Sequence, residues 1–319
     1  MPLDPAIKGF LDATADAAAL KSADLPIAVV RTRYARYALM AGEGPAMESV
    51  TDATIEGPAG AIAVRIFRPA GGTRAALVWL HGGGWAVGDL DTDDTRCRQL
   101  AARAEVVVIS VDYRLSPEHV FPAAVDDSAA AVAWVIAHAA DYGVDPTRVA
   151  VGGDSAGGNL SAVVCQVLRD RGGAIPAFQL LVYPVADAVG PTPGAPYPSM
   201  VDNGVGYFLT KETMDWAYAT YAGGVDAADP RLSPMRAASL ADLPPAFVLT
   251  AEFDPLRDEG EAYAGALRAA GVSCANVRYE GLIHGFFGME NLFPAAKVGM
   301  DDAVSALRIG LGLQSADLG

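Results

Sequence analysis

The fold is decided by the stretch Arg148-Val-Ala-Val-Gly-Gly-Asp-Ser-Ala-Gly-Gly-Asn-Leu160, in which a short apolar run passes through a glycine-rich turn into a helical segment. Within it, Gly153-Asp-Ser-Ala-Gly157 fits the pattern G-x-S-x-G. A serine at a sharp strand-to-helix turn is exposed above the sheet, and glycines two residues to either side avoid clashes that any side chain would create. A chance match in a chain with 34 glycines is the alternative, but the strand–turn–helix setting favours Ser155 as a nucleophile.

The rest of the chain repeats this alternation of strand and helix. The predicted strands are almost continuously apolar, as a parallel sheet covered on both faces requires. They lie at about 76–80, 106–111, 148–152, 178–183, 246–250 and 275–279, with helices at about 92–104, 122–140, 156–171, 257–271 and 295–312. Such alternation predicts an α/β fold with right-handed crossovers and a mostly parallel sheet. Two earlier segments, 48–56 and 61–68, alternate more clearly and predict an antiparallel hairpin at the sheet edge.

Two regions fall outside the alternation. Residues 1–45 are helical and amphipathic in pattern and precede the first strand. Residues 186–235 begin with a Pro/Gly-rich stretch and continue into an aromatic run, 207–221, that we interpret as a helix. So long an insertion between two strands of one sheet is too much for a plain crossover. The simplest division is therefore a core of residues 46–185 and 236–319, with 1–45 and 186–235 together forming a cap.

A second glycine motif lies earlier in the chain, where a predicted strand leads into His81-Gly-Gly-Gly-Trp85. Successive glycines let the backbone turn so that two N–H groups can aim at one point, which is the geometry that an oxyanion hole requires. The alternative is a glycine-rich loop that binds phosphate. No G-K-[ST] follows the loop, and no G-x-G-x-x-G opens a helix after the first strand, so we favour the oxyanion hole.

A nucleophilic serine needs a general base, and the chain has four histidines. His81 begins the glycine loop, where anchoring the loop is its expected role. His119 lies in a turn before a helix, and His138 falls in the last turns of a helix, where its charge is favourable. His284 follows the last predicted strand in a loop, as a mobile general base should. An ordinary loop histidine is the alternative, and we expect His284 to be the base.

The acid of a triad should lie between the serine and the histidine, at the end of a strand. Asp254 occupies such a place, and a structural role as a helix N-cap is also compatible with the sequence. A buried carboxylate facing an imidazole would hold the correct tautomer. Glu252 and Asp258 are competitors, and we rank Asp254 ahead of both. The chain order Ser155…Asp254…His284 is that of α/β-hydrolases.

Composition narrows the classes of partner and compartment. The 319 residues carry 23 basic and 38 acidic side chains, which give a formal charge of −15, and the mean hydropathy is +0.25. This balance excludes intrinsic disorder, and the negative charge makes nucleic acid and anionic membranes poor partners. The three cysteines have no C-x-x-C spacing, so neither a zinc site nor a disulfide framework is expected. With no signal peptide or membrane span visible, we expect a cytoplasmic protein, and a homodimer remains open.

Taken together, the motifs resemble those of bacterial esterases of the hormone-sensitive-lipase-like family, in the subgroup that carries Gly-Asp-Ser-Ala-Gly. The matching stretches are His81-Gly-Gly-Gly-Trp85, Asp112-Tyr-Arg-Leu-Ser-Pro-Glu-His-Val-Phe-Pro-Ala-Ala-Val-Asp126, Gly152-Gly-Asp-Ser-Ala-Gly-Gly-Asn-Leu160, Asp254-Pro-Leu-Arg-Asp-Glu-Gly260 and His284-Gly-Phe286. The resemblance implies an α/β-hydrolase fold with a helical cap. It also implies that the oxyanion-hole N–H groups belong to Gly83, Gly84 and Ala156.

The resemblance further implies a serine carboxylesterase that hydrolyses short- to medium-chain acyl esters and needs neither a metal nor an organic cofactor. An amidase or acyltransferase on the same fold is one alternative. The other is a binding protein, because the plant gibberellin receptors resemble this family but have lost the catalytic histidine. Since Ser155, Asp254 and His284 are all present here, the residues favour an enzyme.

Overall fold

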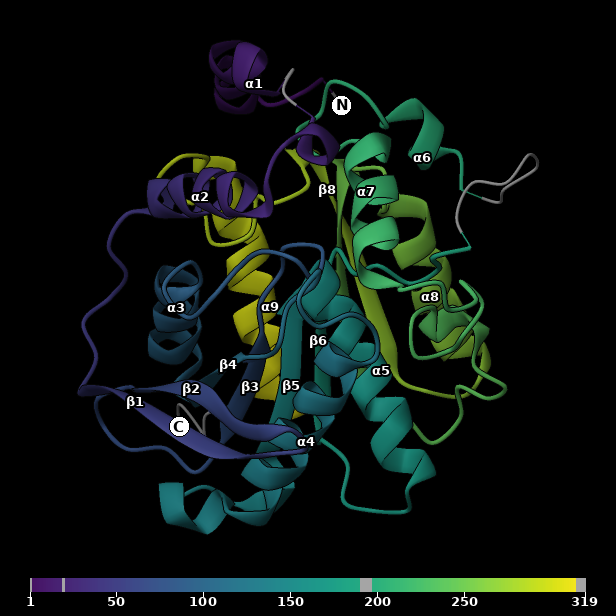
Figure 1. Ribbon diagram of the computed structural model, residues 1–319. Coiled ribbons are helices and arrows are strands. Elements are labelled where there is room, and N and C mark those ends of the chain that lie inside the picture. The colour runs from purple at the N-terminus through teal and green to yellow at the C-terminus, as the bar shows by residue number, and fades with distance from the viewer. Residues whose placement is uncertain (1, 19–20, 190–196, 314–319) are drawn as a thin grey trace.

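The computed structural model describes residues 2–18, 21–189 and 197–313, and its strands form an eight-stranded sheet in the order β1-β2-β4-β3-β5-β6-β7-β8 (Figure 1). The strands are β1 Ser49–Gly57, β2 Gly60–Arg68, β3 Ala76–Leu80, β4 Val107–Asp112, β5 Val149–Asp154, β6 Phe178–Val182, β7 Ala246–Phe253 and β8 Cys274–Ile283. The α-helices are α1 Pro5–Ala18, α2 Ile27–Ala38, α3 Asp94–Ala104, α4 Ala123–Ala137, α5 Ala156–Asp170, α6 Ser199–Asp202, α7 Lys211–Tyr221, α8 Arg257–Ala269 and α9 Lys297–Gly310. The predicted α/β class is confirmed.

One described strand opposes the direction of the others. β2 lies antiparallel to both β1 and β4. The pairs from β4 and β3 through to β7 and β8 are all parallel. The hairpin predicted over 48–56 and 61–68 is therefore confirmed at the edge of a mostly parallel sheet.

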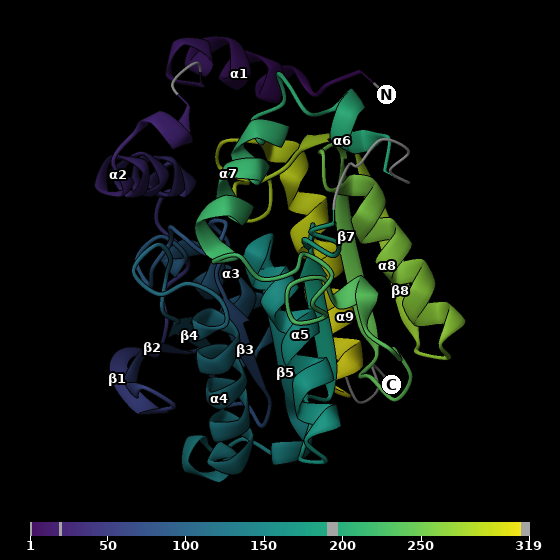
Figure 2. The ribbon, with the colours of Figure 1, turned by 45° about the vertical axis from the view of Figure 1, so that its right-hand side comes forward.

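The central strands are buried on both faces. Every residue of β3, β5 and β6 is buried. Along β3 the side chains alternate, since Val78 and Leu80 join the core against α4, α5 and α8, whereas Leu77 and Trp79 join the core against α3 and α9. Figures 1 and 2 show these two helical layers on opposite faces of the sheet. Burial on both faces explains why these segments are continuously apolar in sequence.

Four helices lie outside the two layers. α1 and α2 of the N-terminal segment, and α6 and α7 of the segment after β6, lie beyond the end of the sheet where β5, β7 and β8 finish (Figures 1 and 2). These two segments contact each other. The ring of Phe208 lies 6.0 Å from that of Phe10 and 4.6 Å from that of Tyr37, and Lys21 pairs with Glu212 at 2.7 Å.

The start of α7 follows the local sequence. Thr210 is the N-cap residue, and its hydroxyl oxygen accepts the Thr213 N–H at 3.1 Å, which satisfies one of the free donors of the first turn. Of the aromatic run 207–221 that the sequence predicts to be helical, the helix begins only at Lys211, after this cap, and ends at Tyr221. Residues 190–196 of the preceding Pro/Gly-rich stretch lie outside the described residues. Across the described ranges, no helix combines the length and the apolar character that a membrane crossing requires.

The core predicts a large difference between two apolar truncations. Leu180 in β6 is fully buried, whereas Ile309 in α9 is 59% exposed. Leu180→Ala should lower the free energy of unfolding by about 2–5 kcal/mol, because it removes buried methyl groups and leaves a cavity. Ile309→Ala should change it by less than about 0.5 kcal/mol. Denaturant unfolding measures both, and equal losses would contradict the described packing.

Candidate active site

Ser155 lies in a strained turn between β5 and α5. Its φ is +55°, a conformation that costs energy in any residue other than glycine. The turn is held by the Ser155 N–H, which donates to the Val182 carbonyl at 2.9 Å. A Cβ on Gly157 would lie 1.9 Å from the Leu80 carbonyl oxygen, so only glycine lets α5 approach β3 this closely. The strand–turn–helix setting predicted for Ser155 is present.

The structure brings the three predicted triad residues together. His284 follows β8 directly, and its Nε2 lies 3.0 Å from the Ser155 Oγ. Its Nδ1 lies 2.7 Å from Oδ2 of Asp254, which follows β7. Both distances are within hydrogen-bonding range. Asp254 is fully buried, and Ser155 and His284 are 8% and 6% exposed, so this chain of hydrogen bonds is largely shielded from water.

Asp254 meets His284, but it is not the N-cap residue of α8, because Leu256 holds that position. While Oδ2 faces His284, Oδ1 accepts the Leu256 N–H at 2.8 Å and so fixes the turn before α8. The two competing carboxylates are engaged elsewhere. Glu252 accepts the Gly281 N–H at 2.7 Å, and Asp258 accepts the Ser199 N–H at 2.7 Å. Asp254 is therefore the acidic residue that meets His284.

The other three histidines have different surroundings. His81 is fully buried at the start of the glycine loop, and its ring stacks on Tyr113 at 4.2 Å. The Tyr113 hydroxyl donates to the His81 carbonyl at 2.7 Å, which anchors the loop. His119 is exposed. His138 is the C-cap residue of α4 and stacks on Trp134. His81 thus lies in the anchored start of the glycine loop and His138 at the end of a helix, as the sequence predicts.

The glycine loop lies against the serine turn with donors available. Gly83 has φ +116°, and a Cβ there would lie 2.2 Å from the Val87 carbonyl oxygen, so the loop requires glycine. In the described part of the chain, no acceptor takes the N–H groups of Gly83 or Gly84. Ala156 is the first residue of α5, where an N–H has no intrahelical partner. These are the three N–H groups that the resemblance predicts to form the oxyanion hole.

Two side chains beside His284 were not predicted from the sequence. The ring of Tyr183 lies 4.4 Å from the imidazole, and the Tyr37 hydroxyl donates to the Gly285 carbonyl at 3.0 Å. Tyr183 follows β6 directly, and the carboxyl ends of parallel strands are where ligands bind in open α/β sheets, so its position was a usable signal. Tyr37 is 248 residues from Gly285, and no local spacing could reveal that contact.

A buried acid also lies near the triad. Glu259 is fully buried, and its Oε1 accepts the Ala186 N–H at 2.8 Å. Burial raises the pKa of Glu259 to about 8, an effect that the Ala186 and Asp187 N–H groups reduce and the Asp187 and Asp254 carboxylates reinforce. Glu259 is therefore protonated at neutral pH.

Comparisons with known proteins place this geometry in a family. A family described as "alpha/beta hydrolase fold" matches residues 77–288. The chain belongs to this α/β-hydrolase family.

Carboxylic ester hydrolase LipN of Mycobacterium tuberculosis is 51% identical over 271 residues, which are 82% of this chain and 70% of the relative. Ethyl acetate hydrolase of Pseudomonas putida is 39% identical over 281 residues, which are 85% of this chain and 86% of the relative. The structure of an ester hydrolase from the metagenome of Lake Arreo has a TM-score of 0.91 and 41% identity, and covers 97% of this chain and 99% of its own.

These findings confirm the resemblance to hormone-sensitive-lipase-like carboxylesterases, within the α/β-hydrolase superfamily. Esterase relatives at this identity show that this α/β-hydrolase is an enzyme, a serine carboxylesterase. Among the residues that the structure describes, no group of three or more His, Cys, Asp or Glu side chains is arranged to hold a metal ion.

The serine turn predicts that Gly157→Ala is damaging. The added methyl group would collide with the Leu80 carbonyl, so β3 and α5 must move apart and carry the glycine loop away from Ser155. We expect ester turnover to fall by about 100-fold, because small misplacements at a reacting centre are costly. Gly173→Ala, just after α5, has no heavy atom within 4 Å of the added group and should keep normal turnover. Undiminished turnover in Gly157→Ala would contradict the described approach.

Glu259→Gln should flatten the pH dependence of stability. With a pKa of about 8 when folded against an ordinary 4.5, this carboxyl binds more protons in the folded protein. Its contribution to the free energy of unfolding is thus present below pH 4.5 and lost as the pH rises toward 8. The amide cannot ionise, so Tm should fall less between about pH 5 and pH 9 than in the wild type.

The matched control for this titration is Glu261→Gln, on the same helix. Glu261 is partly exposed and pairs with Arg278 at 2.6 Å. Its variant should keep the wild-type slope of Tm against pH. The assignment is wrong if Glu259→Gln also keeps that slope.

Proposed function

We propose that this carboxylic ester hydrolase works through a covalent acyl-enzyme formed on Ser155. His284 Nε2 takes the hydroxyl proton while Oγ attacks the ester carbonyl carbon. The tetrahedral intermediate collapses, the alcohol leaves with the proton from His284, and the acyl group stays on Ser155. Water, deprotonated by His284, then attacks the acyl carbonyl, and His284 returns that proton to the Ser155 Oγ as the carboxylic acid leaves. Asp254 orients the imidazole and stabilises its protonated form.

The observation that carries this proposal is the continuous chain of hydrogen bonds from Ser155 Oγ through His284 to Asp254, at 3.0 and 2.7 Å. The base reaches the proton that it must abstract, and the acid reaches the opposite ring nitrogen. Burial of Asp254 strengthens its interaction with an imidazolium, because the local dielectric is low.

We assign the oxyanion hole to the N–H groups of Gly83, Gly84 and Ala156. Two come from the loop after β3 and one from the start of α5, so they approach the Ser155 side chain from two elements. Donors fixed in advance stabilise the developing oxyanion without reorganising in the transition state. The positive end of the α5 dipole adds to this effect.

We further propose that residues 1–45 and 186–235 act as a cap that limits the substrate to short- and medium-chain acyl esters. The support is that Ser155 is only 8% exposed, and that α1, α2, α6 and α7 lie beyond the end of the sheet at which β5 leads into Ser155 (Figures 1 and 2). A Cβ built on Gly84 would lie 3.0 Å from the Ala217 Cβ in α7, so the insertion reaches the glycine loop. The name of the Pseudomonas putida relative, ethyl acetate hydrolase, is consistent with a small ester.

We also propose a cytoplasmic location. Its support is that Cys97, Cys165 and Cys274 are all free thiols, as a reducing compartment favours.

Turnover of p-nitrophenyl esters from acetate to palmitate tests the mechanism and the cap together. We expect kcat/KM to peak at short or medium chains, and a matched p-nitroanilide to react far more slowly. Ser155→Ala should lower kcat by about 10⁴-fold or more. Ser239→Ala, at an exposed serine, should leave kcat unchanged. Near-normal turnover in Ser155→Ala would overturn the mechanism, and a peak at palmitate would overturn the role of the cap.

A further inference from the structure

A buried group of charges lies beneath the glycine loop. Arg96 of α3 is 10% exposed, and its Nη1 lies 2.6 Å from Asp93 Oδ1 and 3.4 Å from Asp154 Oδ1. The side chains of Asp93 and Asp154 are 1% and 6% exposed. Buried charges are costly unless they are paired and hydrogen-bonded. We therefore asked which contacts this cluster makes with the site.

Arg96 connects the three loops that carry the reacting groups. Asp154 immediately precedes Ser155, and the same Oδ1 that faces Arg96 accepts the Gly82 N–H of the glycine loop at 2.8 Å. On its other side, Arg96 Nε–H donates to the Phe287 carbonyl at 3.1 Å, in the loop that follows His284. One guanidinium therefore contacts the serine turn and the histidine loop directly, and it is linked to the glycine loop through Asp154. The planar fork of donors makes this possible, because each N–H points in a fixed direction.

We propose that Arg96 is a positioning residue for ester hydrolysis, which sets the distance between the oxyanion donors, Ser155 and His284 by binding Asp154 and the Phe287 carbonyl at once. The inference rests on the proposed function, since it concerns the geometry of that same site. Arg96 does not touch the reacting atoms, and it acts through the three loops. Asp93 pairs with Arg96 through one carboxylate oxygen, and its other oxygen accepts the indole N–H of Trp79.

The charges in this cluster depend on one another. Burial alone would lower the pKa of Arg96, but Asp154 and Asp93 outweigh it and raise that pKa well above its ordinary value. Burial raises the pKa of Asp154, and the Arg96 cation is the main influence that opposes the rise, with His284 and the Gly82 N–H helping. Without the cation, Asp154 becomes an uncompensated buried carboxylate that favours its protonated form. The Gly82 N–H would then face a weaker acceptor.

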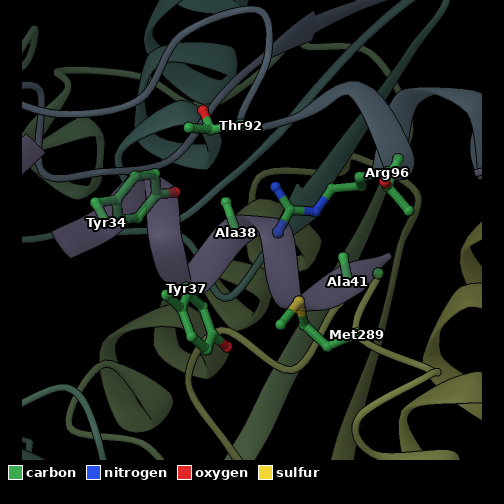
Figure 3. A pocket seen from close by; sticks show the side chains of 9 residues that line it. Tyr34, Tyr37, Ala38, Ala41, Thr92, Arg96 and Met289 are labelled. Atoms are coloured by element: carbon green, nitrogen blue, oxygen red, sulfur yellow. The ribbon is translucent and has the colours of Figure 1, made fainter. Parts of the chain in front are cut away.

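The surroundings of Arg96 do not leave room for a ligand. In Figure 3 its side chain extends toward Ala38 of α2, with Tyr34 and Tyr37 on the same helix. The cavity between them is about 10 Å³, which suits a single water molecule. Tyr34, Tyr37 and Tyr183 also face the cluster, and burial raises the pKa of each, so all three are neutral. The charge of Arg96 is therefore compensated by Asp93 and Asp154 rather than by a ligand.

Two variants of Arg96 and one control test the proposal. Arg96→Met removes the charge and the donors, and Arg96→Lys keeps the charge but cannot reach all three partners. The matched control is Arg98→Met, since Arg98 lies on the same helix and pairs with Asp94 at 2.5 Å, away from Ser155. A p-nitrophenyl phosphonate titrates the reactive serine with release of p-nitrophenolate. This gives the number of competent molecules, so that kcat is expressed per titrated site.

We expect Arg96→Met to lower kcat per titrated site by about 100-fold while KM changes by less than about threefold. The reason is that the substitution displaces the groups that stabilise the transition state and leaves substrate binding nearly unchanged. Arg96→Lys should lose about 10-fold. The acid limb of the kcat/KM profile should move to higher pH in Arg96→Met only, since burial of Asp154 is no longer offset by a cation. Arg98→Met should match the wild type in all three readouts.

A merely structural role predicts something else. The phosphonate titre would then fall with Tm, while kcat per titrated site and the pH profile would stay as in the wild type, and that result overturns the proposal. If Arg96→Met does not fold, Arg96→Lys decides, and a wild-type kcat per site in that variant also overturns it. Failure of the proposed function is a distinct outcome, because the wild type itself would show no ester turnover.

Discussion

The structure depends on the close approach between α5 and the end of β3. Ser155 can hold a φ of +55° only because its N–H is fixed to Val182 and the helix after it lies against the Leu80 carbonyl. Glycine at position 157 makes that contact possible. The same contact sets the glycine loop beside Ser155, because the loop begins one residue after Leu80. A nucleophile in a strained turn and an oxyanion hole thus have one common cause in backbone packing.

The parallel sheet supplies the remaining members of the site. β5, β7 and β8 finish at the same edge, so residues far apart in sequence, Ser155, Asp254 and His284, meet there. Parallel strands buried on both faces are rigid, and loops at their carboxyl ends inherit well-defined positions. The distances of 3.0 and 2.7 Å within the triad follow from this arrangement. Arg96 is a buried side chain that connects loops which no strand joins directly.

The sequence predicted the parts of the molecule whose cause is local. Apolar runs gave the strands, and glycines next to Ser155 and His81 marked turns that only glycine can adopt. It placed the end of β7 too early, because Glu252 is polar, yet this residue stays in the strand and accepts the Gly281 N–H from β8. Contacts between segments far apart in the sequence could not be predicted. Neither Tyr37 on Gly285 nor Arg96 on Phe287 has any spacing rule, since both arise only when the chain is folded.

The most direct test of the central claim is to locate the covalent intermediate. The enzyme would be inactivated with one equivalent of a p-nitrophenyl phosphonate, digested, and the modified peptide sequenced by tandem mass spectrometry. The account predicts a single adduct on Ser155, formed at a rate that falls sharply in His284→Ala, because the hydroxyl then lacks its base. Complete inactivation with the adduct on another residue would contradict it. So would labelling of Ser155 that proceeds equally fast without His284.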